Sequence, residues 1–372
     1  MNSAIRSIVF CLSIGVQTLA QGGNAASAQR PEDVRLVMTT RTSTFEKELN
    51  QAAGEGFRLT CLARAVYAGT VAAILSRNHN PAGNPAGSGP QVRYEYKALA
   101  TSRLATMRTE LEQAVAEGYE YRGMTSENSS LPFSRKETIA VLERPAGETK
   151  RRFEYKLVTA RKEQEDLDAA AAAGFVPVDV FVTDRSAVES MFSFSASNLR
   201  LNFIFSREAG QSGSQTPVSQ YRLIWRADNV KMQTELNELA REGFQLKLVA
   251  VYPVALMSRP GQGRTQQYEY TVLADMRKKP LPVQMTEAGA RGYQFRGASY
   301  GLTMTAVMER AMGGSAGSGE VEYKILGTIR ESTTRREMDE ALASGFTVRD
   351  FLSLNENLLV LGKKAAPNSR AR

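Results

Sequence analysis

Alternating large apolar and polar side chains recur at six places along the chain, and a stretch with helical period follows each one. At residues 153–158, the run FEYKLV alternates as a half-buried strand does. In the stretch MQTELNELAREGF, Met232, Leu236 and Leu239 fall at steps of four and three, on one face of a helix. A second apolar run ending in a basic residue closes each repeat, as TIAVLER does at 138–144. The pattern predicts a unit of one strand, one helix and two further strands.

A glycine followed by an aromatic residue ends the helical stretch of every unit. Glycine adopts the left-handed conformation that terminates a helix without a penalty from Cβ. The aromatic residue begins the next strand and can pack back on the helix. We therefore assign structural helix-stop roles to Gly56, Gly118, Gly174, Gly243, Gly292 and Gly345.

The six units fall into two sets of three. The first unit matches the fourth, the second matches the fifth through EGYEYRG and ARGYQFRG, and the third matches the sixth. This order predicts an α+β protein of six tandem β-α-β-β units, each a three-stranded sheet plus one helix, arranged as two homologous lobes. We place the boundaries at 1–28 (signal peptide), 29–209 (lobe 1, units 33–78, 92–145 and 152–208), 210–219 (linker), 220–364 (lobe 2, units 220–260, 267–310 and 320–364) and 365–372 (disordered tail).

The first 28 residues follow the order of a secretory signal peptide. One positive charge in MNSAIR precedes the short apolar run SIVFCLSIGV, and an Ala-x-Ala site ends at Ala28. The apolar run is too short to span a bilayer, which needs about 20 residues. We expect cleavage after Ala28 and a periplasmic or secreted location. Cys61 is then the only cysteine left, so an intramolecular disulfide is excluded.

The charge of the chain does not point to nucleic acid. The 47 Lys and Arg exceed the 39 Asp and Glu by a net charge of +8, but the basic residues are scattered in short clusters. A nucleic-acid groove shows denser basic residues interleaved with exposed aromatics. No later segment is apolar enough to cross a membrane.

Few residues offer recognisable chemistry. His79 is the only histidine and lies in a Pro/Gly/Asn-rich linker, so it is a poor candidate for a catalytic triad or zinc site. Two segments are rich in glycine, GNPAGSG (83–89) and GGSAGSG (313–319), and neither carries the Lys-Ser/Thr of a phosphate-binding loop. We assign no catalytic, cofactor-binding or metal-binding residue. A hydrolase that uses two carboxylates stays open, because such pairs meet only in three dimensions.

One insertion distinguishes the third unit from the sixth. The stretch TDRSAVESMFSFSASN (183–198) has almost no counterpart in lobe 2. Either it forms a longer hairpin whose apolar side packs locally, or it is an exposed contact loop. Met191, Phe192 and Phe194 are the candidate contact residues. A more polar excursion lies at 125–137 in the second unit. The paired aromatics of the first strands, such as Tyr94 and Tyr96, suit a structural role, with a stacking platform as the alternative.

The units resemble a small bacterial domain family of unknown function whose members read roughly Tyr-Glu-Tyr-Lys-Val-Val, Leu-Asn-x-Leu-Gly and Glu-Gly-Trp-Glu-Leu. The closest stretches are FEYKLV (153–158) and LNELAREGFQL (236–246). The family's tryptophan is Phe or Tyr in all six copies. The resemblance implies a fold and no activity.

These observations favour an exported, non-enzymatic repeat protein of the bacterial envelope that acts as a protein-binding or scaffold module. One alternative is a periplasmic protein that binds a small ligand in clefts between units. Another is a carboxylate-dependent hydrolase. The partner is then an envelope protein or a small ligand. The pattern does not decide between a closed ring of units and a linear stack.

Overall fold

The structure is a computed structural model that describes residues 33–65, 70–77, 92–127, 137–160, 162–184, 199–210, 219–261, 266–275, 279–300, 303–313, 320–328, 330–353 and 356–364. The expected signal peptide (1–28), the candidate contact residues Met191, Phe192 and Phe194, and the expected tail (365–372) lie outside the described residues. They stay predictions.

Six helices occupy the stretches whose period predicts them, and each ends two residues before one of the six glycines. They are α1 (Thr42–Gly54), α2 (Leu104–Ala116), α3 (Glu163–Ala172), α5 (Asn229–Arg241), α6 (Leu281–Ala290) and α7 (Glu331–Ala343). The six glycines have φ values between 78° and 91°, in the left-handed region. After α1, the Gly56 amide donates to the Ala53 carbonyl at 2.9 Å, and the Phe57 amide donates to the Ala52 carbonyl at 3.0 Å. These two bonds form a Schellman motif, which satisfies carbonyls at the helix end.

Each unit contains a three-stranded antiparallel sheet with its third strand in the middle. The first and second strands are therefore parallel to each other, and the helix connects them. In lobe 1 the strands are β1 (Asp33–Thr39), β2 (Arg58–Leu62), β4 (Val71–Arg77), β5 (Tyr94–Thr101), β6 (Glu120–Glu127), β7 (Glu137–Pro145), β8 (Phe153–Thr159), β9 (Val176–Asp184) and β10 (Leu199–Glu208). In lobe 2 they are β11 (Gln220–Trp225), β12 (Gln245–Val249), β13 (Val254–Arg259), β14 (Tyr268–Ala274), β15 (Gln294–Tyr300), β16 (Met304–Ala311), β17 (Glu320–Thr328), β18 (Thr347–Ser353) and β19 (Asn357–Lys364). These elements confirm the predicted α+β class and its six units.

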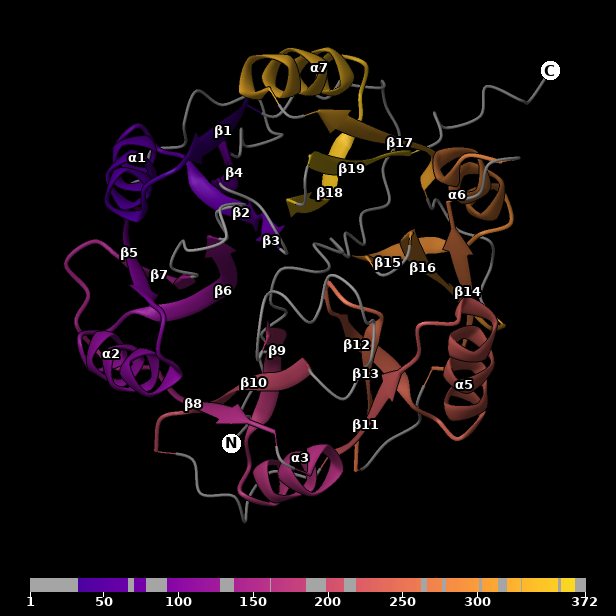
Figure 1. Cartoon of the computed structure of the whole chain (residues 1–372), viewed down its shortest axis with the longest axis horizontal. Coiled ribbons are helices and arrows are strands. Elements are labelled where there is room, and N and C mark those ends of the chain that lie inside the picture. Colours follow the sequence, from indigo (N-terminus) through magenta and orange to yellow (C-terminus); the bar gives the residue numbers. More distant parts are fainter. Residues whose placement is uncertain are drawn as a thin grey trace, which may run out of the picture.

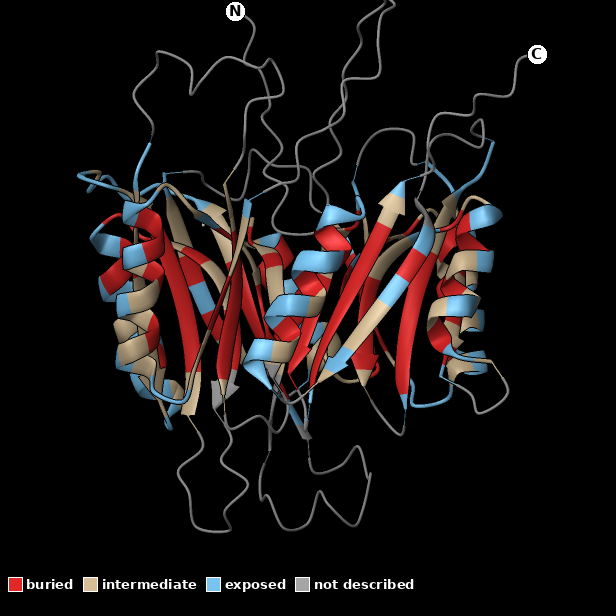
Figure 2. Cartoon of the chain, turned by 90° about the horizontal axis from the view of Figure 1, so that it is seen from above, coloured by how far each residue is buried: buried red, intermediate tan, exposed pale blue. Residues whose placement is uncertain are grey.

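The units close into a ring, which decides between the ring and the linear stack (Figure 1). Each helix packs against the first strand of the next unit, so that α1 contacts β5 and α6 contacts β17. The last helix, α7, contacts β1 of the first unit. Across that closure the Arg335 guanidinium donates to the Leu36 carbonyl at 3.4 Å. The helices form the outer wall with their exposed residues outward, and most of the buried residues lie on the strands inside it (Figure 2).

The apolar core is continuous across both meeting points of the two lobes. Phe203 of the third unit and Tyr221 of the fourth belong to one buried cluster. Phe351 of the sixth unit and Ile74 of the first belong to another. A short fourth strand, β3 (Arg64–Ala65), also pairs in parallel with β18. Apolar burial of this kind closes the ring between the sixth and first units.

A tyrosine of the first strand joins each of several neighbouring pairs of units. The Tyr96 hydroxyl accepts a hydrogen bond from the Leu59 amide of the preceding unit at 2.7 Å and donates to Glu143 at 2.7 Å. The same hydrogen bond, from the backbone amide three residues after the glycine of the preceding unit to a tyrosine hydroxyl, is made by Tyr155, Tyr270 and Tyr323. Tyr96 and its equivalents thus have a structural role, as expected, and the structure locates it at the joints between units.

A basic residue at the end of the third strand covers the aromatic residue after each glycine. In the second unit, the Arg144 guanidinium lies 4.4 Å from the centre of the Tyr119 ring. It donates to the Glu117 carbonyl at the end of α2 and to the Glu95 carboxylate, both at 2.8 Å. The same cation–π contact occurs in all six units, as Arg77 over Phe57, Arg144 over Tyr119, Arg207 over Phe175, Arg259 over Phe244, Arg310 over Tyr293 and Lys363 over Phe346. It explains the recurrent basic residue as part of a clasp between helix end and sheet.

A β-bulge interrupts the second strand of every unit, two to four residues after the aromatic. A bulge bends its strand and re-aims the side chains that follow. The residue after the bulge is Gly123 in the second unit and Gly297 in the fifth. A Cβ on Gly297 would lie 2.9 Å from Cβ of Val249 in the neighbouring unit, so glycine allows a close approach there. At the same position the third and sixth units carry Asp179 and Asp350.

Candidate functional site at the hub of the ring

The inner ends of the second strands meet at the centre of the ring, which we call the hub. Two aspartates from opposite units, Asp179 and Asp350, lie there, and their carboxylates accept equivalent hydrogen bonds from backbone amides. The Asp350 carboxylate accepts the amides of Ala298 at 3.0 Å and of Phe351 at 2.9 Å. Asp179 accepts the amide of Val180 at 2.8 Å and that of Met124. Met124 and Ala298 occupy equivalent positions in the second and fifth units. The duplication thus preserves two carboxylates, each joined to the unit before it.

Arg64 crosses the hub and connects four units. Its side chain starts in the first unit and forms an ion pair with Asp350 of the sixth, through both Nε and Nη2. Nη1 donates to the Val249 carbonyl of the fourth unit at 2.7 Å, and Nη2 donates to the Ala298 carbonyl of the fifth at 2.8 Å. A planar guanidinium is suited to this geometry, because its donors point to several acceptors at once.

The other half of the hub lacks this arginine. The counterpart of Arg64 in the fourth unit is Val251, which follows Ala250 as Arg64 follows Ala63. Asp179 instead accepts the hydroxyl of Tyr121 at 2.5 Å. The counterpart of Tyr121 in the fifth unit is Phe295, which has no hydroxyl. The two buried carboxylates are therefore stabilised by different side chains: Arg64 bonds to Asp350, and Tyr121 bonds to Asp179.

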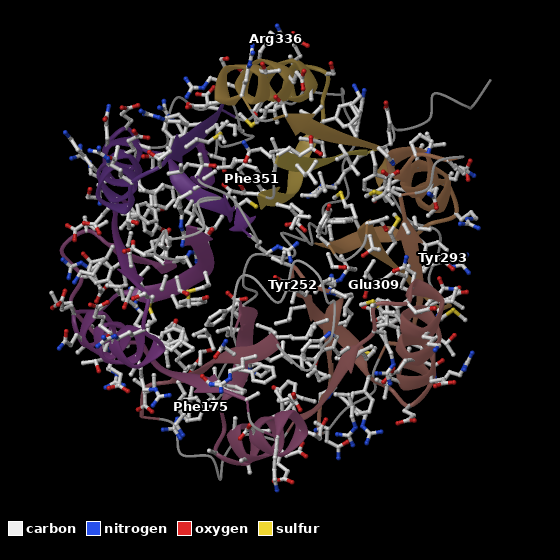
Figure 3. All side chains as sticks on the ribbon, viewed as in Figure 1. Phe175, Tyr252, Tyr293, Glu309, Arg336 and Phe351 are labelled. Atoms are coloured by element: carbon white, nitrogen blue, oxygen red, sulfur yellow. The ribbon has the colours of Figure 1, made fainter. Side chains whose placement is uncertain are left out.

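A small cavity of about 50 Å³ lies beside Asp179. Its lining comes from four units: Arg64, Met124, Thr125, Thr138, Asp179, Val180, Phe181, Ala250, Val251 and Tyr252. Figure 3 shows Tyr252 and Phe351 toward the middle of the ring, whereas Arg336 lies on its outer rim. The cavity is large enough for water or a small ion but far below the 300–1,000 Å³ of a typical ligand pocket.

Thr125 lines this cavity with a hydroxyl that has no hydrogen-bond partner among the described residues, and the residue is only 3% exposed. Its counterpart in the fifth unit, Ser299, bonds to Thr305 at 2.6 Å. In the second unit the strand residue opposite Thr125 is Ile139, which cannot bond. A buried polar group without a partner is unfavourable by about 1–3 kcal/mol. The Thr125 hydroxyl is therefore a hydrogen-bonding position that a molecule in the cavity could satisfy.

Burial dominates the electrostatics of this half of the hub. It raises the pKa of Asp179, although the bonds from Tyr121 and Val180 and the charge of Arg64 act in the opposite direction. Burial and the nearby Asp179 carboxylate also raise the pKa of the Tyr121 hydroxyl. Tyr121 therefore keeps its proton and remains a hydrogen-bond donor to Asp179.

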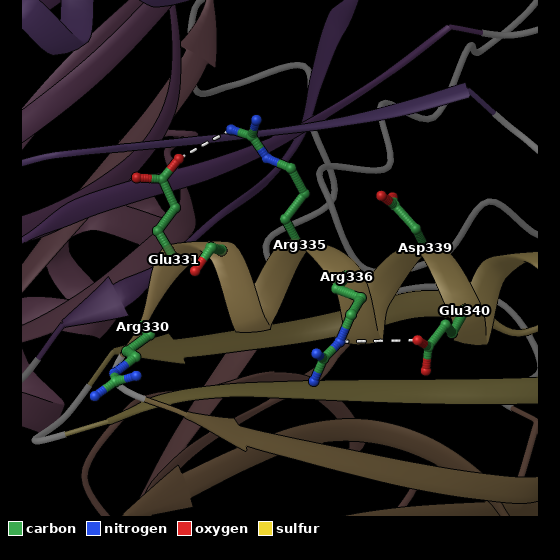
Figure 4. A pocket seen from close by; sticks show the side chains of 7 residues that line it. Arg330, Glu331, Arg335, Arg336, Asp339 and Glu340 are labelled. Atoms are coloured by element: carbon green, nitrogen blue, oxygen red, sulfur yellow. Dashed lines mark hydrogen bonds and ion pairs between the residues drawn. The ribbon is translucent and has the colours of Figure 1, made fainter.

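A larger but shallow depression lies on the outer surface of α7 (Figure 4). Its charged side chains pair along the helix, as Arg335 does with Glu331 at 2.9 Å and Arg336 with Glu340 at 3.8 Å. A single solvated helix face lines it. These contacts support a structural interpretation of the depression rather than a site.

The six helix-stop glycines do not converge on the hub, because they terminate helices in the outer wall. The residues that do converge were not identified as a site from the sequence. A usable signal existed: Asp179 and Asp350 are each the fifth residue after their unit's glycine. Within the described ranges, no group of three or more His, Cys, Asp or Glu side chains is placed to hold a metal ion.

Comparison with protein-family models, with curated proteins and with solved structures found no match. The resemblance to the small bacterial domain family therefore stays a prediction. Among the described helices, none is both long and apolar enough to cross a membrane.

Proposed function

We propose that the chain is an exported, non-enzymatic ring of the bacterial envelope that binds a protein partner through one face. The proposal is supported by the way the charged side chains of the hub are bonded. Arg64 and Asp350 bond to other units, and Asp179 accepts two amides and a hydroxyl. These groups hold the ring together, so recognition falls to its faces.

The long connections between strands in lobe 1 indicate which face of the ring binds the partner. The segments that distinguish lobe 1 connect the second and third strands of two adjacent units: residues 128–136 join β6 to β7, and residues 185–198 join β9 to β10. In lobe 2 the equivalent connections are only 301–303 and 354–356. Because β6 contacts β9, both longer segments start beside each other at the same end of the hub strands. Extended connections on a rigid scaffold are a common place for recognition.

The test is affinity capture from envelope extracts with the full chain. The variant replaces Met191, Phe192 and Phe194 by Ser, and the matched control replaces Val230, an exposed residue of α5, by Ser. We expect a partner captured by the wild type and the control to be lost with the variant. Retention of the same partners by the variant would contradict the proposed face.

Export is tested separately, by intact mass of the protein recovered from its native cells. A chain that begins at Gln29 and is released with the periplasm or the medium is the expected result. A chain that retains residues 1–28 in the cytoplasm would refute the proposed location.

Binding of a small molecule is the second candidate, and the hub cavity favours it only for a very small ligand. The carboxylate-dependent hydrolase has less support. Its candidate carboxylates, Asp179 and Asp350, are both engaged by backbone amides, which serves the joints between units.

A further inference from the structure

The hub contains one occupied and one unfilled position for a guanidinium group. At the occupied position, the Arg64 guanidinium contacts Asp350 and the carbonyls of Val249 and Ala298. The pseudo-twofold relation between lobes maps Arg64 onto Val251 and Asp350 onto Asp179. It predicts where a second guanidinium would lie if the fourth unit carried an arginine.

The cavity beside Asp179 lies next to that position, and Arg64 lines it from the other side. Its lining includes Asp179, Val251 and Met124, which are the counterparts of Asp350, Arg64 and Ala298. Valine is too short to cross the hub as Arg64 does, so the space is left open. The carboxylate nevertheless keeps the two amide donors that orient its counterpart.

Thr125 gives a second, independent indication of a ligand. Its hydroxyl is buried, has no partner in the part of the chain that the structure describes, and lines the same cavity. A hydroxyl can accept a hydrogen bond from a cationic N–H group while Asp179 accepts others. The site therefore offers a carboxylate and a neutral acceptor, which is a set suited to a cation with several donors.

The charges at the hub lead to the same conclusion. Arg64 supplies one positive charge, which also acts on Asp179 across the cavity that both residues line, whereas Asp179 and Asp350 supply two carboxylates. Arg64 is committed to Asp350 through two nitrogen atoms. The Tyr121 hydroxyl is uncharged, so it bonds to Asp179 without neutralising it.

We propose that this cavity binds a guanidinium-class cation, held by Asp179 and Thr125 in the place that an arginine side chain fills in the other half of the hub. The cation would join the second, third and fourth units as Arg64 joins the first, fourth, fifth and sixth. Those units include the two that carry the long connections, so the ligand would stiffen the proposed binding face.

The test measures the thermal midpoint of the full chain with 0–10 mM guanidinium chloride. Urea at the same concentration is the control for shape, because it is planar and similar in size but uncharged. Potassium chloride is the control for ionic strength. Binding with a dissociation constant of about 1 mM stabilises the folded chain by about 1.4 kcal/mol at 10 mM guanidinium, which raises the midpoint of a chain of this size by about 2 °C. We expect no such rise with urea or potassium.

Three variants link the response to the site. Val251→Arg supplies the guanidinium from the chain, so we expect a higher midpoint and no response to added guanidinium. Asp179→Asn should lose the response, and Thr125→Val should weaken it by several-fold in apparent affinity. If Val251→Arg fails to fold, the other two variants still decide. Absence of a rise in the wild type, an equal rise with potassium or urea, or an unchanged response in Asp179→Asn would each overturn the proposal.

Discussion

The hydroxyl of Tyr96 connects two units, and its removal in Tyr96→Phe measures what one such joint contributes. It accepts the Leu59 amide and donates to Glu143, each at 2.7 Å. The fourth unit provides a natural control. Tyr221 lies on the equivalent strand, but the residue that would supply the amide is Pro177, which has no N–H. Both tyrosines are almost fully buried, at 3% and 2% exposure.

The expected magnitude follows from the groups that each variant leaves unpaired. In Tyr96→Phe, the Leu59 amide loses its partner, which costs about 1–3 kcal/mol. The Glu143 carboxylate also loses one donor but keeps Arg58 at 2.7 Å, so its contribution is smaller. We expect a total loss of about 2–4 kcal/mol for Tyr96→Phe. Tyr221→Phe strands no amide, so we expect about 1 kcal/mol or less.

Urea unfolding of the two variants and the wild type, compared at matched m-values, gives the two free-energy differences. A difference of about 2 kcal/mol between the variants would support the joint as described. Equal destabilisation would refute it, because the hydroxyl would then contribute through burial of the ring and not through the amide between units.

Three further predictions address strain, pH and ring closure. Gly118→Ala places a Cβ 2.8 Å from the Thr149 backbone at φ 91°, so it should destabilise the fold by at least about 1 kcal/mol more than Gly147→Ala, where φ is 79° and no atom lies within 4 Å; equal effects on urea unfolding would contradict the close approach. Burial raises the pKa of Glu309 in the folded chain above its ordinary value of 4.5. The stability that Glu309 contributes to the fold is therefore fully present below about pH 4.5 and is lost as the pH rises through the pKa of the folded state. Glu309→Gln should therefore gain stability relative to the wild type between pH 4 and pH 7 in urea unfolding, and a pH-independent difference would count against this. A permutant opened within 210–219, with its old termini joined by about 20 Gly/Ser residues, should remain a folded monomer by size exclusion and calorimetry, because the sixth unit packs on the first. Loss of cooperative unfolding in that permutant alone, beside the intact parent, would argue against closure.

Local chemistry explains why the units were predictable. The alternation of FEYKLV, the 3.6-residue period of each helix and the glycine at its end act over a few residues. The recurrence of these signals in six copies made the order of the two lobes readable. The same locality explains the basic residue that ends each third strand, although its place over the aromatic ring became visible only in the fold.

The hub could not be predicted in this way, because its residues are far apart in the chain. Arg64, Asp179 and Asp350 meet only when six units close into a ring and a bulge re-aims the second strands. Neither the curvature of the ring nor the direction of a side chain after a bulge is encoded within one unit's pattern. The sequence by itself determined the units, their helix ends and their duplication. The tertiary structure decided the closure and the unequal pairing of two equivalent carboxylates, because both depend on packing between units.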